Sequence, residues 1–285
     1  MLNTSASMLT HSKIEAQILL SQWIHPLTQS GWVGKVGSIF QNGFNLNIQQ
    51  QLIYVSAMQP DQLSPIGCQV ALTHSRSLID YIKPGMLIKC EPHQWTLYRR
   101  PQPIQLIIRE TMVESLSIPT LTFKQLAQTE VSSRLNAQIA LESTGLPLEQ
   151  LDGMLDALKS AETQEQRQAA VLPFIGAGIG LTPSGDDFLQ GILIFEQALN
   201  QPPVFQSAVR VASKERQTTS VSSAYYRAVL AGQASRPWIQ LMLAIQKNDT
   251  NQLQQAIQHI QHYGHTSGYD MLAGAAFYLT ELIAS

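Results

Sequence analysis

The sequence predicts an α+β protein in which a mainly antiparallel β domain is followed by an all-α domain. Over residues 31–108, apolar and polar residues alternate in short runs separated by turn residues, which is typical of closely spaced strands. From residue 122 onward, apolar residues recur at helical spacing. We therefore expect a mainly β domain over residues 1–120 and a helical domain over residues 121–285.

The β domain is expected to form an antiparallel sheet or a small barrel. Its candidate strands are residues 33–40, 44–48, 52–55, 69–72, 86–90, 95–98 and 104–108. Ahead of them, Ile14 and Ile18 stand four residues apart, and this spacing predicts a short amphipathic helix over residues 13–24. No motif in this half of the chain indicates catalysis or ligand binding.

The helical domain is expected to hold six or more helices joined by short links, which favours an all-α arrangement. Its candidate helices are residues 123–142, 148–158, 186–199, 204–213, 224–231, 238–246, 252–262 and 269–284. Residues 159–168 are polar and are expected to form an exposed tail.

Composition narrows the class of protein. Only 13% of the 285 residues are charged, well below the usual quarter, and a weakly charged surface favours subunit contacts. The net charge is −2 with no basic stripe, so nucleic acid is not an expected partner. The two cysteines, Cys68 and Cys90, have no metal-type spacing, and no apolar stretch reaches the length of a membrane span. These features predict a cytoplasmic protein with reduced core cysteines and no membrane contact.

The most informative stretch is Phe-Ile-Gly-Ala-Gly-Ile-Gly-Leu-Thr-Pro-Ser-Gly-Asp-Asp-Phe-Leu, over residues 174–189. Glycine stands at every second position, at Gly176, Gly178 and Gly180, and such a loop lets backbone N–H groups approach a ligand closely. A helix is expected to start directly after it. A helix start behind a glycine loop is a ready anion site.

Two adjacent carboxylates follow the loop. Ser184 is a suitable N-cap, and Asp187 is placed to complete a capping box with it. Asp186 is surplus to that cap. Two carboxylates would repel an anion, so the site would need Mg²⁺ or another cation between them and the ligand. The alternative is that these residues only cap the helix.

Part of this stretch is repeated near the C-terminus, and the repeated segment is called its echo below. Residues 184–191 and 267–274 both read Ser-Gly-x-Asp-apolar-Leu-x-Gly, with Asp270 in the place of Asp187. We expect the two helix starts to pack together, with Gly191 and Gly274 at the crossing and the N-termini converging on one pocket. The alternative is a chance similarity between two caps, in which Asp270 also acts only as a capping residue.

Two further loops carry polar groups ahead of a helix. One contains Thr219 and Ser222, and the other contains His265 in a Gly-His-Thr-Ser-Gly turn. His265 is the best acid–base candidate in the chain, and the alternatives are helix capping for the hydroxyls and a structural role for the histidine. The glycine run is followed by neither a Walker lysine nor a βαβ unit, and no His-Glu-x-x-His, Cys-x-x-Cys or Gly-x-Ser-x-Gly motif occurs.

Together, the Leu-Thr-Pro-Ser-Gly-Asp-Asp box, the Gly-His-Thr-Ser-Gly-Tyr-Asp segment and the Thr-Thr…Ser-Ser loop resemble the AllH family, from about residue 33 to the C-terminus. This family was long a domain of unknown function, sometimes labelled a carboxylase. It includes a subunit of oxamate carbamoyltransferase from allantoin degradation, a branch of purine catabolism.

The resemblance implies a transferase that works with other protein subunits and converts oxalurate and phosphate into oxamate and carbamoyl phosphate. This chemistry needs an anion cradle, an oxyanion site and a proton for the leaving nitrogen. We expect ligand binding, to phosphate, carbamoyl phosphate or an oxamate-like anion, by Gly176, Gly178, Gly180, Thr182, Ser184, Gly185, Thr219, Ser222, Ser267 and Gly268. His265 would supply the proton as a catalytic residue. Asp186 would orient it or, with Asp187, hold Mg²⁺.

Two other functions remain open from the sequence. One is a non-catalytic subunit that binds a small anion or only stabilises partner chains. The other is a carboxylase-like enzyme that uses bicarbonate.

Overall fold

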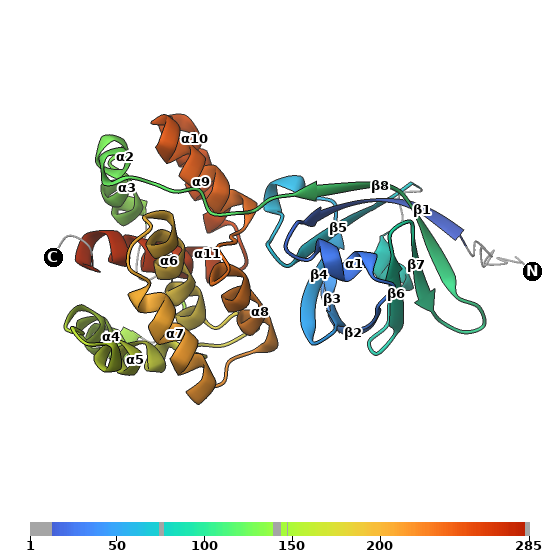
Figure 1. Cartoon of the computed structure of the whole chain (residues 1–285), viewed down its shortest axis with the longest axis horizontal. Coiled ribbons are helices and arrows are strands. Elements are labelled where there is room, and N and C mark those ends of the chain that lie inside the picture. Colours follow the sequence, from blue (N-terminus) through green and yellow to red (C-terminus); the bar gives the residue numbers. More distant parts are fainter. Residues whose placement is uncertain (1–12, 74–76, 139–143, 147, 283–285) are drawn as a thin grey trace, which may run out of the picture. The chain divides into compact units, whose positions relative to one another are not determined.

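The computed structural model describes residues 13–73, 77–138, 144–146 and 148–282, without side-chain placement at 137–138 and 148–150. The chain divides into two compact units, Met1–Ser115 and Leu116–Ser285 (Figure 1). Among the described residues, no helix is long and apolar enough to cross a membrane. Each unit is treated below by itself.

The first unit is a closed barrel of eight strands in the order β1-β5-β4-β3-β2-β6-β7-β8. Neighbouring strands are antiparallel except for the pairs β1–β8 and β4–β5, which are parallel. The strands are β1 (Lys13–Ser21), β2 (Val33–Ile39), β3 (Gly43–Ile48), β4 (Gln51–Ala57), β5 (Gly67–Leu72), β6 (Leu87–Glu91), β7 (Gln94–Tyr98) and β8 (Ile104–Glu114). The predicted α+β class is confirmed. Of the two expected β arrangements the barrel is found, but two of its strand pairs are parallel rather than antiparallel.

The barrel interior is filled by side chains from alternate strand positions, among them Leu46, Ile88 and Trp95, which are fully buried. Both cysteines are free and buried in this unit. Burial raises the pKa of the Cys68 thiol to about 12, and it raises the pKa of Cys90 well above its usual value. They are inert, as expected of core cysteines.

The helix predicted over residues 13–24 is wrong. Residues Lys13–Ser21 form strand β1, which pairs with β5 on one side and β8 on the other. Ile14, Ala16, Ile18 and Leu20 are all buried, so the true period is two. A spacing of four fits both a strand and a helix, and sheet pairing decides between them. The short helix α1 (His25–Gln29) follows the strand.

The second unit is helical (Figure 1). Its helices are α2 (Phe123–Thr129), α3 (Val131–Gln138), α4 (Leu148–Lys159), α5 (Gln164–Val171), α6 (Ser184–Ala198), α7 (Val204–Glu215), α8 (Ser220–Val229), α9 (Arg236–Lys247), α10 (Thr250–Gln261) and α11 (Ser267–Phe277), which continues into the π-helical segment η5 (Tyr278–Leu282). A short 3-10 turn, η4 (Leu172–Phe174), precedes the glycine loop.

Three predicted boundaries in this unit need correction. Helix α8 begins at Ser220, four residues before its predicted start at residue 224, so Ser222 lies in the helix rather than in the loop before it. The helix expected over residues 123–142 is broken at Glu130, whose φ is 53°, into α2 and α3. Its last predicted residues, 139–142, and the predicted end of α11 at 283–284 lie outside the described residues. The polar tail expected at 159–168 contains the start of α5, which Thr163 and Gln166 begin with a capping box.

Helix α6 forms the centre of this unit, and nearly all of its side chains are buried. It packs most extensively against α11. A Cβ atom at Gly191 would lie 1.9 Å from the Met271 carbonyl oxygen, and one at Gly274 would lie 1.9 Å from the Phe188 carbonyl oxygen. The two helices therefore touch backbone to backbone, as the echo between their sequences predicts, and only glycine fits at the two contacts.

This contact predicts the effect of adding one methyl group. Gly191→Ala should destabilise the helical unit by at least about 1–3 kcal/mol, because the new Cβ would overlap a backbone oxygen. The matched control is Gly153→Ala in α4, where a Cβ would meet nothing within 4 Å. That change should stabilise by about 0.5–1 kcal/mol. Chemical denaturation of both variants tests the contact, and equal effects would contradict it.

Candidate functional site

The loop between η4 and α6 depends on its glycines. Gly176, Gly178 and Gly180 have φ of 68°, 110° and 98°, which side chains rarely tolerate. A Cβ at Gly178 would lie 2.8 Å from the Ser184 nitrogen, so this glycine also lets the loop lie against the start of α6. The alternation of glycine thus reflects backbone conformation at all three positions. The tip carries Ile179, which is 96% exposed.

Asp186 joins three segments of this unit. One carboxylate oxygen accepts hydrogen bonds from the Gly176 N–H at 3.0 Å and from the Tyr226 hydroxyl at 2.9 Å, and the other accepts from Thr218. The residue is 0% exposed. Asp186 therefore fixes the glycine loop and α8 to α6. These tertiary contacts give Asp186 a structural role that the sequence pattern did not predict.

Asp187 lies beside it and is 2% exposed. Its Oδ1 accepts a hydrogen bond from Gln190 at 3.1 Å, whereas its Oδ2 is buried without a hydrogen-bond partner among the described residues. Burial raises the pKa of Asp187 well above its usual value, and the nearby hydroxyls of Ser267 and Thr182 only partly oppose this. A neutral carboxyl group is favoured at this position.

Asp270 occupies the equivalent place in α11. It is 0% exposed, its Oδ1 accepts from the Gly145 N–H at 2.9 Å, and its Oδ2 is buried without a hydrogen-bond partner among the described residues. Burial raises the pKa of Asp270 as well, against the lowering effects of the Ser184 hydroxyl and the Gly145 N–H. The pairings are reciprocal, because the serine of each echo lies near the aspartate of the other.

The capping alternative is wrong for both helices. Pro183 and Thr266 occupy the N-cap positions of α6 and α11, and neither helix start has a side-chain capping bond. Ser184 is the first helical residue of α6, and it is turned toward Asp270 and the Gly145 loop. Asp270 therefore holds a tertiary contact to Gly145, whereas the hydrogen bond of Asp187 comes from Gln190 in its own helix.

The start of α8 reaches the same loop. The Thr219 hydroxyl donates to the Leu181 carbonyl and accepts from the Ser222 N–H at 3.0 Å, so this predicted binding residue is also a cap. Ser222 is 0% exposed, and its hydroxyl has no hydrogen-bond partner among the described residues. From the start of α11, the Ser267 hydroxyl lies 2.9 Å from that of Thr182.

Three helix starts, those of α6, α8 and α11, thus meet around the glycine loop. Each start leaves N–H groups that the helix itself does not bond. In the described part of the chain, the N–H groups of Ser184 and Ser267 have no acceptor. Two of the predicted glycines allow close packing of these helix starts. A Cβ at Gly185 would lie 2.1 Å from the Phe174 carbonyl oxygen of η4, and one at Gly268 would lie 1.9 Å from the Ile260 carbonyl oxygen of α10.

His265 stands two residues before Ser267 and is not joined to the buried carboxylates by any hydrogen bond found among the described residues. It is exposed in the turn before α11, whereas Asp186 is fully buried. No hydrogen bond or ion pair of His265 is found within the described ranges. The pairing of His265 with Asp186 is therefore not seen in this arrangement.

Several contributing residues escape local sequence reasoning. Tyr226, Thr218 and Gly145 supply donors to the buried carboxylates from 40, 32 and 125 residues away. Arg216 donates at 3.3 Å to the carbonyls of Leu172 and Pro173, which places a positive charge near the base of the glycine loop. These residues are so far from the motif in the sequence that their spacing could not predict the contacts.

The donor set does not fit a metal ion well. Across the residues that the structure describes, no group of three or more His, Cys, Asp or Glu side chains is arranged to hold one. Both oxygens of Asp186 already accept hydrogen bonds, which leaves Asp187 Oδ2 as the free oxygen of the predicted Mg²⁺ pair. We therefore derive no step through magnesium.

The Asp186 network predicts a measurable coupling. Asp186→Asn should cost about 1–3 kcal/mol of folding free energy, because an amide replaces an acceptor that faces three donors. Tyr226→Phe should cost less, and the double variant should show positive coupling in denaturant unfolding. Tyr269→Phe, at the echo position of Asp186, is the matched control and should stay within about 0.5 kcal/mol of the parent. An unchanged melting curve for Asp186→Asn would contradict the network.

The raised pKa values of Asp187 and Asp270 predict how stability depends on pH. Their protonated forms favour the folded state, so this contribution is complete below about pH 4, the usual carboxyl value, and is lost as pH rises through the folded-state pKa. The free energy of unfolding should fall by up to about 1.4 kcal/mol per pH unit for each such proton.

Asp187→Asn removes one of these titrations. Its unfolding free energy should decline less between pH 5 and pH 8, measured by denaturation with far-UV circular dichroism. Asp152→Asn, an exposed carboxylate in α4, should run parallel to the parent. Parallel curves for all three proteins would show that the buried carboxyl is ionised throughout.

Comparison with known proteins finds a similarity that lies within the helical unit. No solved structure shows a significant match to the chain. The family model described as oxamate carbamoyltransferase subunit AllH matches residues 174–279, a narrower span than the resemblance expected from about residue 33. The matched span starts at the glycine loop and includes the starts of α6, α8 and α11. Over residues 174–279 the chain is therefore similar to the AllH family.

Proposed function

We propose that the chain is a subunit of a carbamoyltransferase related to oxamate carbamoyltransferase, and that the meeting point of three helix starts binds its anionic reactant. The reaction would convert oxalurate and phosphate into oxamate and carbamoyl phosphate. The observation that carries the proposal is the convergence of α6, α8 and α11 around a loop of positive-φ glycines. Helix N-termini carry partial positive charge, and three of them favour an anion.

The polar rim of this meeting point offers donors of the right kind. Thr182, Thr219 and Ser267 are half-buried, and their hydroxyls surround the loop. The free N–H groups of Ser184 and Ser267 add two donors. Arg216 supplies a full positive charge near the loop base. A phosphate or carboxylate group is the class of ligand that such donors recognise.

The buried carboxyl groups are compatible with an anion. Burial keeps Asp187 and Asp270 toward their neutral forms, since it raises the pKa of each. Three donors surround the Asp186 carboxylate and balance part of its charge. The repulsion expected from adjacent carboxylates is therefore reduced without a metal ion.

The leaving nitrogen of a carbamoyl transfer needs a proton. Asp187 suits this role better than His265, because it holds a proton at higher pH than an ordinary carboxyl group and lies next to Ser267 and Thr182. His265 is instead exposed in the turn before α11.

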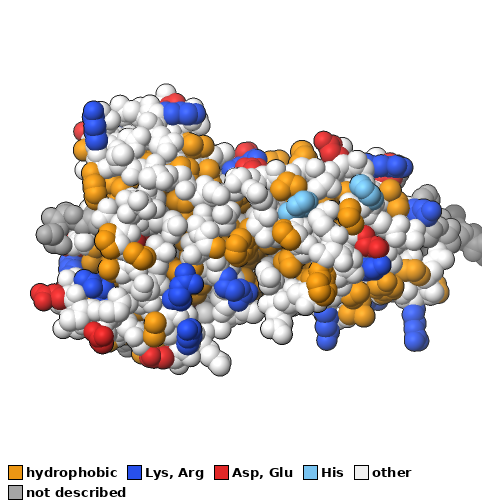
Figure 2. All heavy atoms as spheres, viewed as in Figure 1, with side chains coloured by type: hydrophobic (Ala, Val, Ile, Leu, Met, Phe, Trp, Pro, Cys, Tyr) orange, Lys and Arg blue, Asp and Glu red, His pale blue; other side chains and the backbone are white. Residues whose placement is uncertain are grey.

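A second candidate is a non-catalytic anion-binding subunit. Ile179 at the loop tip is 96% exposed and Leu181 is 44% exposed, directly beside the proposed anion site. An apolar tip of this kind favours coverage by a partner chain. Figure 2 shows charged side chains scattered among uncharged ones on one face of the molecule, in keeping with the low charge of the sequence.

Calorimetric titration with phosphate, carbamoyl phosphate and oxamate tests anion binding. Thr182→Val should weaken binding about tenfold, because it removes a hydroxyl that faces a charged ligand. The matched control is Thr250→Val, at the exposed start of α10, which should bind like the parent. Absence of binding by all three anions would refute the anion site.

Turnover separates the two candidate functions. The chain is assayed alone and with the proteins that co-purify with it, for carbamoyl phosphate formed from oxalurate and phosphate. Formation that is lost in Asp187→Asn supports the catalytic subunit. Anion binding without any turnover, together with full activity of Asp187→Asn in the complex, supports the non-catalytic one.

A further inference from the structure

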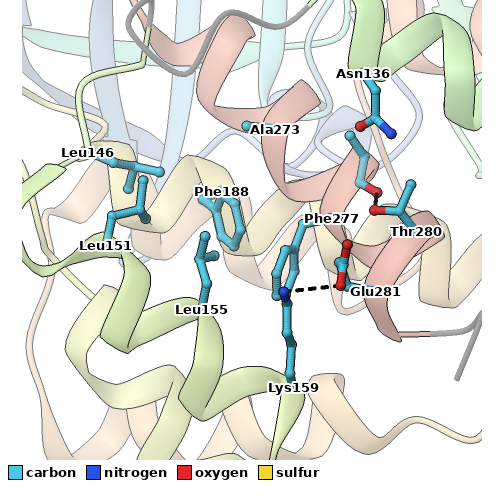
Figure 3. Close-up of a pocket in the computed structure, with 11 residues that line it drawn as sticks. Asn136, Leu146, Leu151, Leu155, Lys159, Phe188, Ala273, Phe277, Thr280 and Glu281 are labelled. Carbon is cyan, nitrogen blue, oxygen red and sulfur yellow. Dashed lines mark hydrogen bonds and ion pairs between the residues drawn. The ribbon is translucent and has the colours of Figure 1, made fainter.

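A cavity of about 340 Å³ lies within the helical unit, apart from the site described above. Helices α3, α4, α6 and α11 and the π-helical segment η5 form its walls (Figure 3). It is lined by Asn136, Leu146, Leu151, Leu155, Lys159, Phe188, Ala273, Ala276, Phe277, Thr280 and Glu281. None of these residues belongs to the candidate anion site. The volume is at the low end of the range of about 300–1,000 Å³ found for small-molecule pockets.

The walls of this cavity are apolar. Phe188 and Phe277 face the same space, with ring centroids 5.7 Å apart and planes tilted by 49°. Three leucines, Leu146, Leu151 and Leu155, stand across from these rings in Figure 3. Such a surface suits a short aliphatic or aromatic side chain.

Two opposite charges stand at one end of the cavity. Lys159 Nζ lies 3.0 Å from Glu281 Oε2, and the same nitrogen lies 5.7 Å from the centre of the Phe277 ring. The side chains are 40% and 44% exposed, so the ion pair itself adds little stability. Glu281 belongs to a π-helical segment, a rare conformation that is frequent at functional sites.

We propose that this cavity binds a small zwitterion with an apolar side chain, of the class of leucine or phenylalanine. The carboxylate of the ligand would replace Glu281 as the partner of Lys159, and its ammonium group would pair with Glu281. The side chain would lie among Phe188, Phe277 and Leu155. A simple carboxylic acid would take Lys159 from Glu281 and offer that carboxylate no ammonium group in exchange. A simple amine would pair with Glu281 but offer Lys159 no carboxylate.

The test uses the full chain and measures binding only, so it is independent of the proposed transferase activity. Leucine and phenylalanine are titrated calorimetrically beside three truncated ligands. Of these, 4-methylpentanoate lacks the ammonium group, 3-methylbutylamine lacks the carboxylate, and glycine lacks the apolar side chain. At least one of the two amino acids should bind with one-to-one stoichiometry. Each truncated ligand should bind at least about tenfold more weakly, since one charged contact or the apolar contact is lost.

Variants then locate the site. Lys159→Met and Glu281→Gln should each weaken binding about tenfold while the melting temperature stays close to that of the parent. Lys247→Met, which removes the last-turn lysine of α9, is the matched control and should bind normally. Ala273→Leu fills the cavity and should abolish binding in a protein that still melts cooperatively. Absence of binding by both amino acids, equal binding of 4-methylpentanoate, or normal binding by Lys159→Met and Glu281→Gln would overturn the proposal.

Discussion

The helical unit depends on one backbone contact, that between α6 and α11. At Gly191 and Gly274 the helices approach until a single methyl group would overlap a carbonyl oxygen. The contacts advance in the same direction along both helices, from Ser184 and Asp270 at their starts to Phe188 and Phe277 further along. Because the helices run side by side, their N-termini open at the same place. The position of the candidate site therefore depends on glycine at positions 191 and 274, where no side chain would fit.

This arrangement places carboxyl groups where two opposing effects act on them. The partial positive charge of a helix start favours an ionised carboxylate, whereas burial favours the neutral acid. Burial dominates at Asp187 and Asp270, because each has one oxygen without a hydrogen-bond partner among the described residues. Asp186 differs because three donors surround it. Neighbouring aspartates thus differ in environment: three donors hold the Asp186 carboxylate, whereas burial raises the pKa of Asp187.

The sequence patterns correctly predicted features that depend on residues close together in the chain. The glycine positions, the echo and its backbone contact follow from φ values and close approach, which only glycine permits. The pattern failed at Ile14 and Ile18, whose spacing of four suits strand and helix alike, so pairing with β5 and β8 decided the outcome. It gave no signal for the hydrogen-bond partners of Asp186, because Tyr226 and Thr218 are distant in the sequence.

The two echoed segments differ at the position that matters most for the third helix. Asp186 in α6 corresponds to Tyr269 in α11, and the extra carboxylate is the one that receives Thr218 and Tyr226. Without it, the shared Ser-Gly-x-Asp pattern still brings α6 and α11 together, since the glycine contacts and the reciprocal serine–aspartate pairs do not involve Asp186. The carboxylate adds α8 to this pair and holds the glycine loop against it. The repeat accounts for two of the three helix starts, and the replacement of Tyr269 by Asp186 at the equivalent position accounts for the third.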